Sequence, residues 1–263
     1  MLKKIIRQII EKLSPGLAFA IRIRRLGKYE PETDILPYIV KSGELAIDVG
    51  ANKGYFTYFI MKYTQKLLVF EPSPSLASDL YRTFGKKIKI EKVALSNEFG
   101  KATLSIPVSS GQKVFMLGTI EPDNPLAGSE NVITVDVEKK RLDDYQLEKV
   151  GFIKIDVEGH ELAVLQGSRK LLVRDLPSLL IEAEDRHKPD AVKEINEFLK
   201  EFGYKGFFLL NNEIKPIEEF NIEKHQNPSI TPDRTLKERP LYINNFFFIA
   251  NNEIIKKLPR TLN

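Results

Sequence analysis

Apolar residues recur along this chain in short runs that are separated by polar turns and amphipathic stretches. The runs predict buried strands at residues 45–49, 67–70, 88–93, 152–155, 178–181, 206–210 and 246–250. Apolar positions spaced three and four apart predict helices near residues 32–41, 55–63, 75–84, 161–173 and 191–202. Strands that alternate with helices are typical of a doubly wound α/β fold with a mostly parallel sheet. No helical pattern separates the last two strands, so we expect the final strand to be antiparallel.

Two stretches interrupt this alternation. Residues 100–106 and 132–137 have the pattern of short antiparallel strands around a loop, 107–131, that is rich in Ser, Gly, Pro and Asn. Residues 211–244 form a long polar connection that contains four prolines. Ligands in open α/β sheets bind beyond the carboxyl ends of the strands. Because the second connection leaves such an end, we expect it to cover the site.

The first 28 residues differ from the rest in pattern and in charge. One face of a predicted helix carries Leu2, Ile5, Ile6, Ile9, Ile10 and Leu13, and Ser14-Pro15-Gly16 ends that helix. Residues 1–28 contain eight Lys or Arg residues and one Glu, a net charge of +7, so the remaining residues carry −3 of the total of +4. We therefore divide the chain into a basic amphipathic helical arm, 1–28, and one α/β domain, 29–263.

The arm has two interpretations. Its apolar face packs against the domain or against a second subunit of a homodimer, as most apolar helical stripes do. The alternative is peripheral contact with an anionic membrane surface, with Leu and Ile inserted and Lys and Arg at the headgroups. The longest early apolar stretch, 17–21, is too short to span a bilayer.

Composition excludes several other classes. A mildly acidic body without a basic stripe is not typical of a protein that binds nucleic acid. The chain has no Cys, and hence no disulfide, no thiolate metal site and no Cys nucleophile. That composition fits a reducing compartment, so we expect a cytoplasmic protein, with contact to the inner face of the membrane as the added option for the arm.

The strand at 45–49 is followed by Gly50-Ala51-Asn52-Lys53-Gly54 and a predicted helix. A strand, a glycine turn and a helix bring backbone N–H groups close to a ligand. The next strand ends in Glu71-Pro72, where a carboxylate can accept hydrogen bonds from both hydroxyls of a ribose. The two features together predict a nucleoside-type cofactor.

The spacing narrows the choice of cofactor. The dinucleotide fingerprint Gly-x-Gly-x-x-Gly has glycine where this chain has Asn52. Asp48, just before the turn, would repel a pyrophosphate but suits a cofactor with an ammonium and a sulfonium group, such as S-adenosyl-L-methionine (SAM). A nicotinamide-dependent oxidoreductase is therefore the disfavoured enzyme alternative. A non-catalytic nucleoside-binding module is the alternative outside enzymes.

A second group of polar residues follows the strand at 152–155. Asp156, Glu158 and His160 lie where a reacting atom would sit in a doubly wound fold, and Glu182 ends the next strand. Carboxylates and an imidazole at this place are candidates for proton transfer. In the simplest alternative Glu182 only pairs with Lys154. A divalent metal on the three carboxylates is a minor alternative, and we assign no metal ligand.

The order of motifs along the chain resembles the FkbM-type methyltransferases over about residues 43–183. The matching segments are Asp48-Val49-Gly50-Ala51-Asn52-x-Gly54, Phe70-Glu71-Pro72-x-Pro74, Val93-Ala94-Leu95-Ser96-Asn97 before Gly100, Arg141-Leu142-Asp143-Asp144, Lys154-Ile155-Asp156-Val157-Glu158-Gly159-x-Glu161, Val164-Leu165-x-Gly167, and Pro177 before Glu182, with a weaker match at Asn244-Asn245-Phe246. So many motifs in one order are far more specific than the glycine turn alone.

The resemblance implies a class I methyltransferase, with a Rossmann-like, seven-stranded, mostly parallel sheet. It implies SAM-dependent O-methylation of a hydroxyl on a sugar or small-molecule acceptor. It also implies cofactor binding by Asp48, Gly50, Ala51, Asn52, Gly54, Glu71, Pro72, Ala94, Leu95, Ser96 and Asp156. Ala94-Leu95-Ser96 would border the adenine, and Asp156 would lie near the transferred methyl group. The expected catalytic residues are Asp156, then Glu158, then His160, because position 160 varies within the family pattern.

Overall fold

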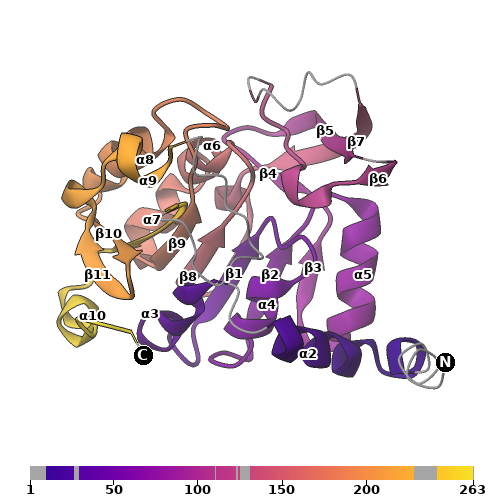
Figure 1. Ribbon diagram of the computed structural model, residues 1–263, viewed down its shortest axis with the longest axis horizontal. Helices are drawn as coiled ribbons and strands as arrows, with labels where there is room; N and C mark the ends of the chain where they lie inside the picture. The colour runs from indigo at the N-terminus through magenta and orange to yellow at the C-terminus, as the bar shows by residue number, and fades with distance from the viewer. Residues whose placement is uncertain are drawn as a thin grey trace.

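The computed structural model describes residues 10–26, 30–109, 111–122, 124, 131–227 and 242–262. Within these residues the main sheet (Figure 1) has eight strands in the order β11 (Glu213–Pro216), β10 (Lys205–Leu210), β12 (Asn245–Ile249), β9 (Ser178–Glu182), β8 (Val150–Ile155), β1 (Leu45–Val49), β2 (Leu67–Phe70) and β3 (Lys89–Glu91). Neighbouring strands from β9 to β3 pair in parallel, and β12 is antiparallel to β9 and β10. The predicted parallel sheet and antiparallel final strand are confirmed.

Helices cover both faces of this sheet, because successive residues of each buried strand point to opposite sides. Within β1, Ile47 belongs to the core on one side and Ala46 to the core on the other. The first core is closed by α6 (Glu161–Gln166), α7 (Arg169–Asp175) and α8 (Ala191–Lys200). The second core is closed by α2 (Pro15–Leu26), α3 (Leu36–Ile39), α4 (Tyr55–Ile60), α5 (Pro74–Phe84) and α10 (Asn252–Lys257).

A smaller sheet stands above the carboxyl ends of β1, β2 and β3 (Figure 1). Its described strands follow the order β4 (Ala94–Leu95), β7 (Val132–Lys140), β5 (Gly100–Ser109) and β6 (Gln112–Lys113). β5 and β7 pair antiparallel, which confirms the strands predicted at 100–106 and 132–137. Leu104, Ile106 and Val137 form a small apolar core with Ala94.

The main sheet differs from the prediction at both edges. The sequence predicts a polar connection from residue 211, whereas Asn211 and Asn212 form a tight turn into an eighth strand, β11. Their φ angles of 53° and 65° suit a two-residue hairpin, and asparagine tolerates them. At the other edge, the strand predicted at 88–93 is shortened to β3, because the chain crosses to the smaller sheet at β4.

Two predicted helices are each divided. The helix at 32–41 is a 3₁₀ turn, Pro31–Asp34, followed by α3, because Pro37 has no N–H with which to continue the ladder. The helix at 161–173 breaks between α6 and α7 at Gly167, where a Cβ would lie 2.0 Å from the carbonyl oxygen of Ser96. The remaining short helices are η2 (Gly85–Lys87), η3 (Phe115–Leu117), η4 (Leu142–Asp144), η5 (Ile217–Glu219) and α9 (Ile222–His225).

The arm and the two long loops are described in part. Of the helix predicted at 2–13, residues 10–13 are helical and residues 1–9 lie outside the described residues. The basic segment that follows is helix α2, which packs Phe19 and Ile23 against the domain. Residues 228–241, in the connection expected to cover the site, and 125–130 also lie outside the described residues. In the described part of the chain, no helix is long and apolar enough to cross a membrane.

Candidate active site

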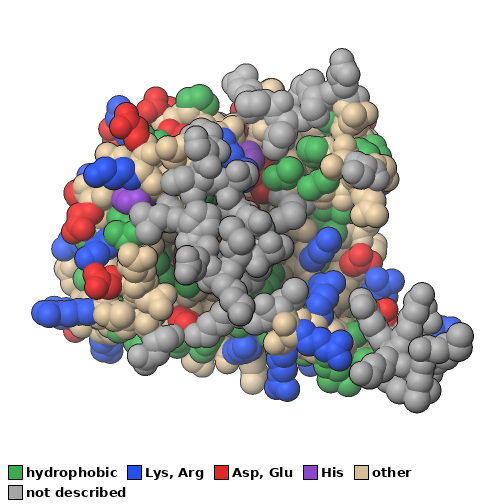
Figure 2. All heavy atoms as spheres, in the orientation of Figure 1, with side chains coloured by type: hydrophobic (Ala, Val, Ile, Leu, Met, Phe, Trp, Pro, Cys, Tyr) green, Lys and Arg blue, Asp and Glu red, His purple; other side chains and the backbone are tan. Residues whose placement is uncertain are grey.

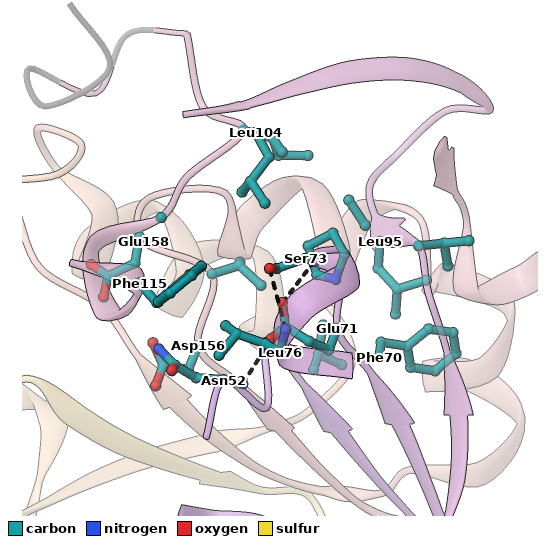
Figure 3. A pocket seen from close by; sticks show the side chains of 18 of the residues that line it. Asn52, Phe70, Glu71, Ser73, Leu76, Leu95, Leu104, Phe115, Asp156 and Glu158 are labelled. Atoms are coloured by element: carbon teal, nitrogen blue, oxygen red, sulfur yellow. Dashed lines mark hydrogen bonds between the residues drawn. The ribbon is translucent and has the colours of Figure 1, made fainter. Parts of the chain in front are cut away.

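A pocket opens where β1, β2 and β8 end, at the carboxyl edge of the main sheet (Figure 3). The strand ends form its floor, and the smaller sheet with η3 forms its roof. The lining residues are Val49, Gly50, Asn52, Phe70, Glu71, Pro72, Ser73, Leu76, Val93, Ala94, Leu95, Leu104, Ile106, Phe115, Gly118, Ile120, Asp156, Val157 and Glu158. Three of these side chains are acidic, and none of the described lining residues is Lys or Arg.

The turn after β1 forms part of the floor because its backbone is bent into left-handed conformations. Gly50, Asn52 and Gly54 have φ angles of 77°, 51° and 84°, a region in which glycine and asparagine are least strained. A Cβ on Gly50 would lie 1.8 Å from the carbonyl oxygen of Asp156, so the turn touches the end of β8 through backbone. Gly54 is outside the lining, and its lack of a side chain lets Phe84 of α5 pack closely.

Glu71, directly after β2, is held from two sides in this pocket (Figure 3). Its Oε2 accepts a hydrogen bond from the backbone N–H of Asn52 at 2.8 Å, and its Oε1 accepts one from the N–H of Ser73 at 2.8 Å. Burial raises the pKa of Glu71 to about 7, although both hydrogen bonds oppose that rise. The carboxylate is therefore fixed in place, titrates near neutral pH and retains lone pairs for a ligand.

Asp48 lies below the pocket, opposite Lys154 in the β1–β8 pair, and is not in the lining. Burial raises the pKa of Asp48 to about 6, against a hydrogen bond from the Thr57 hydroxyl and the charge of Lys154. Lys154 is fully buried, and its Nζ donates to Oδ1 of Asn245 at 3.2 Å and lies 3.9 Å from Oδ2 of Asp156. This lysine is thus a fixed positive charge behind the two aspartates.

The wall at β4 and the roof above it are apolar. Ala94 and Leu95 line the pocket as expected, and Leu104 and Phe115 cover it from the smaller sheet and η3 (Figure 3). The sequence pattern did not predict this roof, because its residues come from a stretch that has the pattern of antiparallel strands and a polar loop. The roof shields the pocket from water on one side.

Ser96 and His160 lie together behind that wall and outside the pocket lining. The Ser96 hydroxyl is 2.9 Å from Nε2 of His160, and Nδ1 of His160 is 2.8 Å from Oε2 of Glu121. Both ring nitrogens of His160 are therefore occupied by protein side chains. That arrangement supports a structural link between β4, α6 and the loop after η3.

Glu158 lines the pocket beside Asp156, in a loop that side chains hold in a strained form (Figure 3). Its φ is 54°, an uncommon value for glutamate. The Glu158 carbonyl oxygen accepts hydrogen bonds from Oγ1 of Thr119 and Nδ2 of Asn124, both at 2.8 Å. Its carboxylate Oε2 lies 2.9 Å from Nε2 of His187. Burial raises the pKa of Glu158 to about 7, while His187 lowers it.

His187 connects Glu158 to a charged cluster in the loop after β9. Burial disfavours the imidazolium, yet Glu158 and Glu184 together raise the pKa of His187 to about 9. Burial also disfavours the Glu184 carboxylate, but His187, 3.6 Å away, and hydrogen bonds from Arg186 and Tyr242 lower its pKa to about 2. We missed this cluster in the sequence. Its signal was the charged run 184–187, which directly follows a buried strand at the edge that carries the site.

Glu182 and the remaining carboxylates form no metal site in the described residues. Glu182 accepts a hydrogen bond from Nδ2 of Asn244 at 2.6 Å and does not pair with Lys154. Burial, with Asp156 as a further cause, raises the pKa of Glu182. Among the residues that the structure describes, no three acidic or histidine side chains could together hold a metal ion.

The structure thus assembles much of the predicted site. It brings into one lining Gly50, Asn52, Glu71, Pro72, Ala94, Leu95, Asp156 and Glu158. It places outside that lining Asp48, Ala51, Gly54, Ser96 and His160. Asp48 is buried directly below the turn and Ala51 is buried within it, so both shape the floor of the pocket and do not face a ligand.

Comparison with known proteins gives consistent results. The sequence profile of the methyltransferase FkbM domain matches residues 48–205. Methyltransferase 1 of Beauveria bassiana is 29% identical over 154 residues, which are 51% of this chain and 61% of that protein. Methyltransferase sdnD of Sordaria araneosa is 31% identical over 160 residues, which are 48% of this chain and 61% of that protein. The matches span about three fifths of each relative.

A solved structure shares the fold. The methyltransferase FkbM from Methylobacillus flagellatus KT superposes with a TM-score of 0.50 at 17% identity, over 83% of this chain and 50% of that one. The chain thus has the fold of class I SAM-dependent methyltransferases, with a mostly parallel sheet, as the motif order implies.

Proposed function

Because the chain belongs to the FkbM methyltransferase family, we propose that it transfers a methyl group from SAM to a hydroxyl of a sugar or small-molecule acceptor. The observation that carries the proposal is the charge of the pocket. Asp156, Glu158 and Glu71 line it, and no basic side chain is among its described lining residues. Such a pocket favours a cationic ligand and disfavours a pyrophosphate, which would lie among these carboxylates without a counter-charge.

The residues present fit SAM. Glu71 is fixed by two backbone N–H groups and can accept hydrogen bonds from ribose hydroxyls. The turn at Gly50 has no space for a side chain, so backbone forms the surface there. The apolar wall and roof at Leu95 and Phe115 suit a flat, weakly polar base. When bound, SAM supplies an electrophilic methyl group on a positively charged sulfur.

Asp156 and Glu158 have different tasks in this proposal. Asp156 is the more exposed, with 27% of its side chain accessible, and its charge stabilises a cation in the pocket. Glu158 accepts the proton of the acceptor hydroxyl at its carboxylate, because its pKa of about 7 lets it act as a base near neutral pH. His187 does not line the pocket and serves as a positioning residue for that carboxylate.

Calorimetric titration tests the cofactor. We expect SAM and S-adenosylhomocysteine to bind and NAD to give no signal. The variant Glu71→Gln keeps the shape of the side chain but cannot accept both backbone hydrogen bonds and carries no charge. It should lose about 1.5–3 kcal/mol of SAM binding, or roughly 10- to 150-fold in affinity. Unchanged SAM affinity in this variant, or tight NAD binding, would contradict the assignment.

Transfer of a radiolabelled methyl group tests catalysis and the acceptor class. The protein is incubated with labelled SAM and separate pools of free sugars, glycosides, phenols and hydroxy acids. Label in one hydroxyl-bearing pool supports the proposal, and Asp156→Asn should lower turnover more than SAM affinity. Tight SAM binding with no label in any pool would instead favour a nucleoside-binding module. Label that is stable to base and attached to nitrogen would overturn O-methylation.

A further inference from the structure

Helix α2 presents two faces with different partners. Its inner face buries Phe19 and Ile23, and Gly16 lies so close to α5 that a Cβ would be 2.8 Å from the carbonyl oxygen of Thr83. Its outer side exposes Leu17 and the short helical segment before it exposes Leu13, with 53% and 78% of their surface accessible. The helix is therefore fixed to the domain while apolar side chains next to it stay in water.

A furrow between α2, α4 and α5 carries these leucines and a basic rim. Its charged lining residues are Lys62, Arg82 and Lys87, and it has no acidic residue among the described lining. A second furrow, at the amino ends of β1 and β2, shares Lys87 and Gly85 with the first. We call the two together the basic furrow. The charged residues of the second part are Lys66, Lys86, Lys87, Lys89, Lys92 and Glu148.

Much of this charge has no counter-charge nearby. Lys86, Lys87 and Lys92 form no ion pair within the described part of the chain. Lys62 has its Nζ over the rings of Tyr58 and Phe59, and burial and the charge of Arg24 lower the pKa of Lys62. Figure 2 shows Lys and Arg side chains gathered around and above α2, with few acidic ones between them. The surface therefore has a positive potential.

We propose that the basic furrow and the outer side of α2 dock on an anionic phospholipid bilayer. Basic side chains alone would suit any polyanion, but the exposed Leu13, Leu17 and Tyr81 among them suit an interface with an apolar layer below its charges. The sequence before α2 continues the pattern, with Leu2, Ile5, Ile6 and Ile9 between Lys3, Lys4 and Arg7. Each Lys or Arg near such a surface strengthens the attraction.

Docking would also orient the active site. The basic furrow is lined by Leu45 and Leu67, the first residues of β1 and β2. The pocket is lined by Val49 and Phe70, the last residues of the same strands. The two sites thus lie at opposite ends of the main sheet. A docked protein presents its pocket away from the lipid, so its acceptor arrives from the aqueous side.

Sedimentation of the full chain with vesicles tests this proposal. At low salt, the protein should sediment with vesicles of phosphatidylglycerol and phosphatidylcholine in equal parts, and stay in solution with phosphatidylcholine alone. The double variant Lys86→Gln/Lys87→Gln should bind about 30-fold more weakly, a loss of about 2 kcal/mol. Leu13→Ser/Leu17→Ser should also weaken binding. The matched control Lys193→Gln/Lys205→Gln removes two exposed lysines elsewhere and should bind like the wild type.

Several outcomes would overturn the proposal. One is that the wild type binds neither kind of vesicle, and another is that the control variant loses as much affinity as the furrow variant. Heparin displaces the protein while Leu13→Ser/Leu17→Ser binds normally, which indicates a general polyanion site. A dimer that the leucine variant dissociates indicates an interface between two copies. SAM affinity and melting temperature are measured for every variant, so that lost binding is not confused with lost structure.

Discussion

The two ends of the pocket are built by different means. At the cofactor end, backbone atoms form the surface of the pocket. Gly50 and Asn52 take left-handed conformations that their residue types tolerate, and backbone N–H groups donate hydrogen bonds to the Glu71 carboxylate. At the carboxylate end, side chains force the backbone: Glu158 has a φ of 54° and is held there by hydrogen bonds to its carbonyl oxygen and by His187. Local sequence specifies the first end, and tertiary contacts specify the second.

This difference implies unequal sensitivity to substitution. A backbone-built site fails when a side chain intrudes, because no neighbour can move out of the way cheaply. A site held by side chains fails more gradually, because one contact can be lost while the others remain.

Gly50→Ala should disrupt the backbone turn that forms the cofactor end of the pocket. The new Cβ would lie 1.8 Å from the carbonyl oxygen of Asp156, and φ is 77°. We expect the free energy of unfolding to fall by about 4 kcal/mol or more, measured by chemical denaturation. Gly43→Ala is the matched control, because Gly43 has a φ of 87° but no atom within 4 Å of a Cβ. It should cost only about 1 kcal/mol. If both variants lose the same free energy of unfolding, the strain of a left-handed φ accounts for the loss and the contact with Asp156 does not contribute.

The affinity for SAM should depend on pH through Glu71. Its pKa of about 7 in the free protein means that a cationic ligand must first find the carboxylate ionised. Between about pH 6 and about pH 8, SAM affinity should therefore rise about tenfold, with proton release on binding at the lower pH. Calorimetry in buffers of different ionisation enthalpy measures both effects. Glu71→Gln should flatten the profile, and a profile that stays steep in this variant would assign the titration to another group.

The Glu71 carboxylate should also make the stability of the fold depend on pH, but stability should fall with rising pH where SAM affinity rises. A raised pKa means that the folded protein holds a proton which the unfolded chain releases near pH 4.5. The resulting stabilisation is present at low pH and is lost as the pH rises through about 7. Without ligand, the melting temperature of the wild type should fall over that range more than that of Glu71→Gln, and saturating SAM should reduce the fall.

His187→Gln should have the smallest of these effects. Glutamine keeps a polar side chain but cannot carry the charge that lowers the pKa of Glu158. The acid limb of the rate profile should move up by about one pH unit, a loss of about fivefold in turnover near pH 7. SAM affinity should stay within about twofold. His160→Gln is the comparison, because His160 lies outside the pocket lining. A larger shift in His160→Gln would reverse the assigned roles.

The sequence predicted the parts of the molecule whose cause is local. The strand at β1, the glycine turn and Glu71 lie within 27 residues, and each residue type there has a direct geometric reason. The need for glycine at position 167 could not be predicted, because it comes from the close approach of the Ser96 carbonyl, far away in sequence. The same holds for the contacts of Tyr242 with Glu184 and of His187 with Glu158, which join residues far apart in sequence.

β12 has a consequence for synthesis of the protein. Among the described strands it is the last in the sequence, yet it lies between β9 and β10 in the sheet. While a ribosome is still making residues 245–249, β9 has an open edge and the β10–β11 hairpin has no neighbour. Lys154 also lacks its partner Asn245 during that time. The emerging chain therefore exposes an apolar strand edge until residues 245–249 have been made, and that interval is when aggregation competes most strongly with folding.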